Sequence, residues 1–147
     1  MSSFDEAALI VKFYSLRWRI ESYFKILKSG CNVEKCRLND GKKLKKNISI
    51  FSVIAWRIHW LTYISRTLPE EPCYKVLTDL EWKTLYIKIH NTGILPNNIP
   101  TSKEVFIWLA RLGGYMARKS DPPPGMISIW RGWIRLQDMV SIHHLIR

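Results

Sequence analysis

Five side chains near the start of the chain have the types and spacing needed to bind a phosphate backbone. They occur at intervals of three, four, four and three residues, as Tyr14, Arg17, Glu21, Lys25 and Lys28. At about 100° per residue, this spacing places all five within roughly 80° of one helical face. Cations at successive turns can follow the phosphates of a nucleic acid, and a carboxylate is a ligand that divalent metals prefer. The set predicts a phosphate-binding face that includes one potential metal ligand.

The same spacing is also typical of an ordinary solvated helix. Glu21 and Lys25 are four residues apart, the separation at which opposite charges stabilise an isolated helix. In this interpretation the charged face only meets water. The two interpretations share the helix and differ in whether a partner covers its charged side.

The distribution of charge favours a partner. The chain has 147 residues, with 23 Lys and Arg against 12 Asp and Glu, for a net charge of +11. Eleven of the basic residues, but only three of the acids, lie between residues 12 and 46. Such an excess favours a polyanion, with nucleic acid the first choice and an anionic membrane surface a remote one. With 47% apolar and 12% aromatic residues, the chain is not a disordered tail.

The elements that must position these side chains are all predicted to be helices. Residues 3–28 lack Gly and Pro, Gly30 provides a stop, and Leu9, Phe13, Leu16 and Ile20 form an apolar stripe expected to pack inward. Residues 44–65 are apolar around most of the circumference, so we expect this helix to be the most buried. Further helices are expected at 78–90 and 101–113, where Thr78 with Glu81 and Thr101 with Glu104 have the spacing of capping boxes, and at 127–145. No segment alternates with period two, so the predicted fold class is all-α with about five helices.

Other features of the sequence predict a dimerisation surface and a cellular compartment. Trp130, Trp133 and Ile134 on the last expected helix are candidates for a dimerisation surface, because aromatic anchors dominate interfaces. The most apolar stretch, 48–64, is interrupted by Arg57 and His59, so no membrane association is expected. Three cysteines and an acidic start without a signal peptide favour the cytoplasm.

The spacing of four of the charged-face residues carries a family resemblance. Tyr14, Arg17, Glu21 and Lys28 match in every position the Tyr-Arg-Glu-Lys signature of bacterial DDE transposases of the insertion-sequence-four family. The segments 17–21, 28–30, 109–115, 124–125 and 130–132 resemble the transposon-five branch of that family. The resemblance extends over nearly the whole chain.

This resemblance implies a fold, a chemistry and a set of roles. The family has a ribonuclease-H-like core in which two Asp and one Glu hold two Mg²⁺ (or Mn²⁺) ions for phosphodiester cleavage and strand transfer. Glu21 would be the catalytic, metal-binding Glu, and Tyr14, Arg17 and Lys28 would contact DNA, with Lys25 joining them by geometry. Residues 1–46 would be the end of the catalytic core, including its last helix. Residues 47–147 would be a helical dimerisation region that binds transposase protomers.

The two catalytic Asp residues of the family have no counterpart in the sequence. They lie on strands upstream of the Glu helix, whereas thirteen residues precede Tyr14 here and Asp5 falls at a helix start. We therefore expect a truncated transposase segment for DNA transposition, inactive alone, inhibitory toward an intact transposase, and cytoplasmic with nucleoid association. The alternative is a standalone small helical DNA-binding or regulatory protein.

Overall fold

The computed structural model describes the backbone of residues 3–31 and 33–145, and the side chains of residues 4–31 and 33–142. Its α-helices are α1 (Ser3–Lys25), α2 (Gly41–Thr67), α3 (Asp79–His90), α4 (Ser102–Leu112) and α5 (Met126–Leu145). A π-helical turn, η1 (Ile26–Gly30), follows α1, and short 3₁₀ turns η2 (Val33–Lys35) and η3 (Cys73–Lys75) lie in the connections. Within the described ranges there are five α-helices and no strand, which confirms the all-α prediction.

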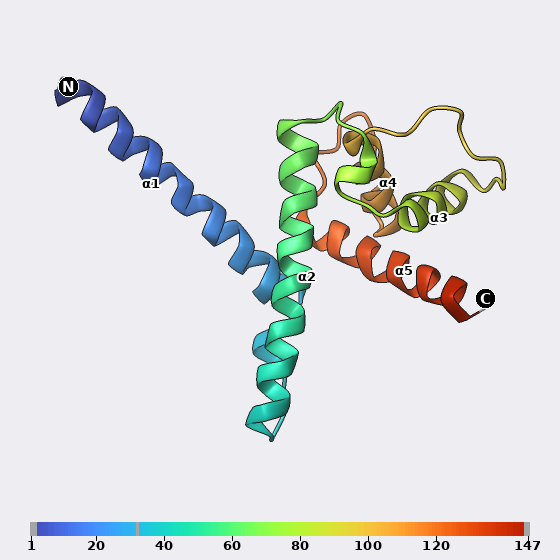
Figure 1. The fold of residues 1–147 in the computed structure, drawn as a ribbon, viewed down its shortest axis with the longest axis horizontal. Helices are drawn as coiled ribbons and strands as arrows, with labels where there is room; N and C mark the ends of the chain where they lie inside the picture. Colours follow the sequence, from blue (N-terminus) through green and yellow to red (C-terminus); the bar gives the residue numbers. More distant parts are fainter. Residues whose placement is uncertain (1–2, 32, 146–147) are drawn as a thin grey trace.

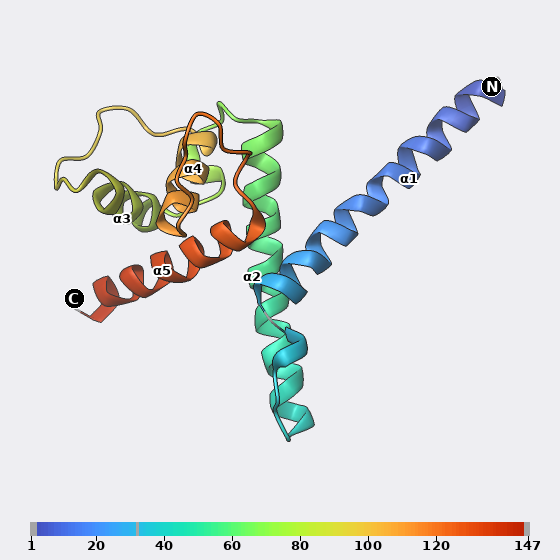
Figure 2. The same cartoon turned by 180° about the vertical axis from the view of Figure 1, so that it is seen from behind.

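Helix α2 divides the molecule. Helices α3, α4 and α5 pack together on one side of it, whereas α1 leaves on the other side as a long projecting arm (Figure 1). The view from behind shows the same separation, with the far ends of α1 and α5 on opposite sides of α2 (Figure 2). The turn η1 packs against both α2 and α5, so it is the joint between arm and body.

The hydrophobic core lies where α2 to α5 meet. Its fully buried members include Ile58, Leu61, Leu85, Leu109 and Leu136. The core also receives Ile26 from η1, which is 1% exposed. Burial of such aliphatic side chains contributes about 1.5–3 kcal/mol each. The arm is therefore attached to the core by the turn at its end.

The helix starts follow from the sequence. Thr78 with Glu81, and Thr101 with Glu104, form capping boxes in which the side chains satisfy the free amide groups of the first turn. At the start of α2, the Asp40 side chain accepts a hydrogen bond from the Lys42 amide at 2.8 Å. This cap explains why α2 begins at Gly41 rather than at the expected residue 44.

Two glycines allow α4 and α5 to cross closely. A Cβ atom on Gly132 would lie 1.9 Å from the carbonyl oxygen of Leu109, and one on Gly113 would lie 1.8 Å from that of Ser128. Any larger residue would collide with backbone rather than with a movable side chain. The α4–α5 contact therefore depends on the missing side chains of both glycines.

The expectation that α2 is the most buried helix is wrong for much of its length. Its buried residues run from Ala55 to Ser65, whereas Ile50, Val53 and Trp56 are 59%, 66% and 57% exposed. The reason is that α3 to α5 cover only one side of its C-terminal half (Figure 1).

The stripe of α1 expected to pack inward is likewise exposed. Phe13 and Ile20 are 64% and 58% exposed, because only the C-terminal end of α1 reaches α2. In the part of the chain that the structure describes, no helix combines the length and apolarity needed to cross a bilayer.

Candidate nucleic-acid interface

The signature side chains lie on the projecting arm. Arg17 forms an ion pair with Glu21, with 3.1 Å between Nη2 and Oε1, and its guanidinium lies 5.2 Å from the centre of the Tyr14 ring. Tyr14 is 63% exposed. Three of the five residues therefore form one connected, solvent-accessible group along α1. Glu21 pairs with Arg17, on the preceding turn, and not with Lys25 as the solvated-helix interpretation supposed.

Lys25 is the last residue of α1, and its side chain is exposed. Among the described side chains it forms no ion pair. An exposed ammonium that forms no ion pair can bind a phosphate without first breaking an intramolecular pair.

Lys28 lies beyond the α-helix, in the π turn η1. A π turn accommodates about one more residue than an α turn, so Lys28 does not keep the angle that a straight helix predicts. Its Nζ atom is 3.0 Å from Glu34 Oε1, and both side chains are more than half exposed. Such an exposed pair contributes about 0–1 kcal/mol, so a phosphate can compete for Lys28. Lys28 is therefore available, but its placement differs from the prediction.

The described residues do not fit a two-metal site. They contain no group of three His, Cys, Asp or Glu side chains placed to hold a metal ion. Glu21 supplies one carboxylate, which is already paired with Arg17. A Mg²⁺ ion needs about six oxygen ligands, and two ions cannot share a single carboxylate as their only protein support.

The three dimerisation candidates occupy different environments. Ile134 is 42% exposed, whereas Trp133 is 4% exposed and packs in the core beneath Arg57, whose guanidinium lies 4.6 Å from its ring centre. Trp130 is half-buried and lies against Gly30, where a Cβ would be 3.4 Å from the indole. The buried position of Trp133 leaves Ile134 as the candidate with substantial free surface. The two tryptophans serve the core and the joint with the arm.

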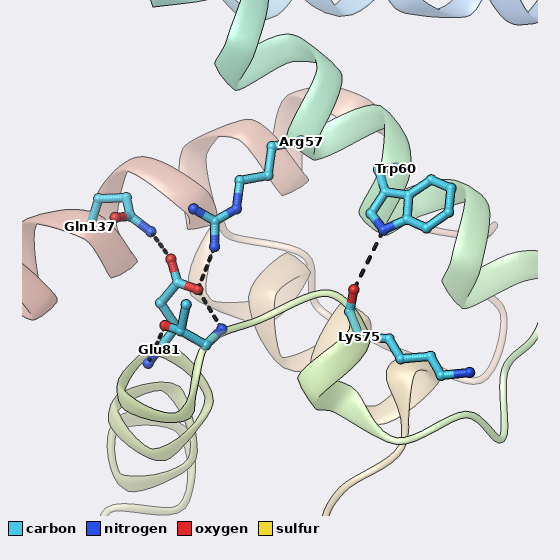
Figure 3. Close-up of polar contacts among 6 residues, drawn as sticks. Arg57, Trp60, Lys75, Glu81 and Gln137 are labelled. Atoms are coloured by element: carbon cyan, nitrogen blue, oxygen red, sulfur yellow. Dashed lines mark hydrogen bonds and ion pairs between the residues drawn. The ribbon is translucent and has the colours of Figure 1, made fainter.

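Sequence reasoning missed a buried polar cluster around Glu81 (Figure 3). The Glu81 carboxylate accepts hydrogen bonds from Arg57 at 2.7 Å, from the Thr78 amide at 2.7 Å and from Gln137 at 2.8 Å. Glu81 is 3% exposed. The capping-box spacing predicted the local bond to Thr78. No local sequence pattern indicates the other two partners, Arg57 on α2 and Gln137 on α5, which lie 24 and 56 residues away.

The arm and the body each match a known family, and both families are transposases. Residues 3–56, which include α1, match the transposase DDE domain. Residues 53–145, which include the bundle of α3 to α5, match the transposase Tn5 dimerisation domain. Since the second match spans more than half of the chain, this chain belongs to the Tn5 transposase dimerisation-domain family. The two matches overlap at residues 53–56, within α2.

Proposed function

We propose that this chain binds DNA phosphates through its arm and other transposase protomers through its helical body, in DNA transposition. The DNA-binding face consists of Tyr14, Arg17, Lys25 and Lys28, in the manner of the Tyr-Arg-Glu-Lys signature of the insertion-sequence-four transposases. The proposed partners are transposon-end DNA and transposase protomers. Binding to this DNA would place the chain at the bacterial nucleoid.

One observation carries the DNA-binding proposal. Helix α1, which lies within the match to the DDE domain, projects from the body (Figure 1), and Tyr14, Arg17 and Lys25 are exposed along it. Exposed cations on a projecting helix can contact the phosphates of a nucleic acid without rearrangement of the fold. The match of the body to a dimerisation domain supports the second half of the proposal.

We further propose that the 147-residue chain does not cleave DNA by itself. In the family, Mg²⁺ or Mn²⁺ supplies the Lewis acidity for phosphodiester chemistry, and Glu21 would be the ligand on the arm. Its pairing with Arg17, and the lack of a three-ligand group among the described residues, support this part of the proposal. Incubation of the purified chain with Mn²⁺ and transposon-end DNA should give no nicked product, and turnover would contradict it.

A salt titration tests DNA binding by the arm. Fluorescence anisotropy with two unrelated duplexes between 50 and 200 mM salt should give weak, equal affinities that fall steeply with salt. Lys25→Gln should reduce the slope of log K against log salt by about 0.9, the contribution of one phosphate contact. Lys88→Gln is the matched control, because Lys88 is exposed on α3, away from the arm.

Two results would contradict the proposal. Equal slopes for the Lys25 and Lys88 variants would remove the arm from the interface. Strong preference for one duplex would instead favour the standalone sequence-specific DNA-binding protein, which reads bases through a recognition helix.

A further inference from the structure

A cationic cavity lies where α1 meets α2, away from the signature face. Its volume is about 240 Å³, and its walls come from α1, α2 and the first residue of α5. The residues that matter here are Arg19 and Ser22 on α1, and His59, Tyr63 and Arg66 on α2. No Asp or Glu lines the cavity.

Arginines from two helices line this cavity, Arg19 from α1 and Arg66 from α2. The guanidinium of Arg19 lies 4.8 Å from the centre of the Tyr63 ring, which holds it by a cation–π contact. Neither Arg19 nor Arg66 forms an ion pair with a described side chain. Arg19 follows Arg17 by two residues, or about 200° around the helix, so the cavity and the signature use different faces of α1.

His59 adds an unsatisfied polar atom. Its Nδ1 is buried and has no hydrogen-bond partner among the described residues. Burial, and then the positive charge of Arg19, lower the pKa of His59. The neighbouring hydroxyls of Ser22, Thr62 and Thr67 already donate to backbone carbonyls of their own helices. The charged donors at the cavity are therefore the two guanidinium groups, and Nδ1 is the buried polar atom without a partner among the described residues.

We propose that this cavity binds one phosphate of a nucleic-acid backbone, held by Arg19, Arg66 and His59. The inference rests on the proposed DNA binding and adds a second contact on another face of the arm. A phosphate suits the donors better than a carboxylate, because its oxygens diverge in three dimensions whereas a carboxylate accepts in one plane. Arginine forks and a buried ring nitrogen converging from two helices match that divergence.

The test combines a readout at His59 with a charge-matched pair of variants. NMR follows the ring signals of His59 in the full chain during titration with duplex DNA and, separately, with inorganic phosphate. The signals are assigned by their loss in the His59→Gln variant. Fluorescence anisotropy then compares the DNA affinity of two double variants. The cavity variant is Arg19→Gln/Arg66→Gln, and the control is Arg118→Gln/Arg131→Gln, whose arginines are exposed outside the cavity. We expect both ligands to shift the His59 signals. The cavity variant should lose about tenfold in DNA affinity relative to the control, as expected for a charge-assisted hydrogen bond.

The outcomes separate this inference from the proposed function. Equal DNA affinity of the two double variants with unmoved His59 signals overturns the cavity site and leaves DNA binding by the signature face intact. Absence of DNA binding by the unmodified chain overturns both. A shift of His59 with poly-glutamate but not with DNA overturns the phosphate and indicates an acidic protein partner. If the cavity variant loses its helical circular dichroism, the His59 response of the unmodified chain decides the question.

Discussion

Glu81 is the carboxylate on which three helices converge, and its removal should destabilise the whole body. Glu81→Ala takes away the acceptor for Arg57, Gln137 and the Thr78 amide together. We expect the free energy of unfolding in urea to fall by about 3 kcal/mol, as when one partner of a buried pair is removed. Glu70→Ala, at an exposed position, is the control and should change stability by less than about 0.5 kcal/mol. Similar losses for both variants would contradict this role for Glu81.

At position 132 alanine should be less favourable than glycine, the reverse of the usual preference in a helix interior. At an unobstructed helical position, Gly→Ala stabilises by up to about 1 kcal/mol. On α5 the added Cβ would meet the Leu109 carbonyl at 1.9 Å, so Gly132→Ala should instead cost roughly 1–3 kcal/mol by thermal or urea unfolding. Gly41→Ala, whose Cβ would meet nothing within 4 Å, should be neutral or stabilising. A rise in melting temperature for Gly132→Ala would show that the helices separate at no cost.

The cysteines should differ in reactivity. Burial raises the pKa of the Cys31 and Cys73 thiols to about 11, so at pH 8 only about one in a thousand is thiolate. Iodoacetamide should therefore modify the half-buried Cys36 first, as followed by mass spectrometry of the folded chain. Because both folded-state pKa values lie above the ordinary 9.0, the stabilisation from keeping these thiols protonated is lost as pH rises from about 9 to 11. Modification of Cys73 as fast as Cys36 would contradict the burial.

At the scale of elements, α1 and α2 should differ in local stability. Most of α1 has no tertiary neighbour among the described residues, and in proteins most helical stability comes from tertiary packing. Amide hydrogen exchange should therefore be fast over residues 7–19 and slowest over residues 55–65 of α2. The measurement is exchange mass spectrometry at several protein concentrations, to separate folding from self-association. Equal protection of both segments in dilute solution would contradict the free arm.

The elements also show which parts of the fold local sequence encodes. Thr78 with Glu81, and Thr101 with Glu104, predicted the starts of α3 and α4, because a capping box is complete within four residues. The π turn at Ile26–Gly30 was not predicted from spacing; its Gly30 lies against Trp130, a hundred residues away, and a contact at that separation leaves no local pattern. The exposed side of α2 was missed for a similar reason. Periodicity reports which residues are apolar, not whether another helix covers them.

The candidate site, too, was only partly predictable from local sequence. Tyr14, Arg17 and Glu21 were predicted on one face and lie together, because an unbroken α-helix preserves a three-and-four-residue spacing. Lys28 was displaced by the π turn. Arg19 and Arg66 are 47 positions apart, and only the crossing of α1 with α2 brings them to one cavity.

At the scale of the whole molecule, the body should compete for the partners of an intact transposase. If the body pairs with a full protomer, as we propose from its match to the Tn5 dimerisation domain, the mixed pair would lack one complete metal site. Co-expression with an intact transposase of the same family should reduce transposition frequency. The reduction should be weaker for Gly132→Ala, which disturbs the body, than for Lys25→Gln, which does not. Unchanged transposition at matched protein levels would contradict the inhibitory role.

The position of η1 at one end of a long helix means that a small change of angle there would move the other end of the helix much further. The 23 residues of α1 form a rod about 35 Å long, and the turn at its end lies with Gly30 against the Trp130 indole. By simple trigonometry on that length, a tilt of about 5° at this turn carries the far tip through about 3 Å. That is roughly the length of a hydrogen bond. A Cβ at Gly30 would meet the indole at 3.4 Å, an ordinary contact, so only a side chain larger than that of alanine would have to tilt the arm and displace its distant end.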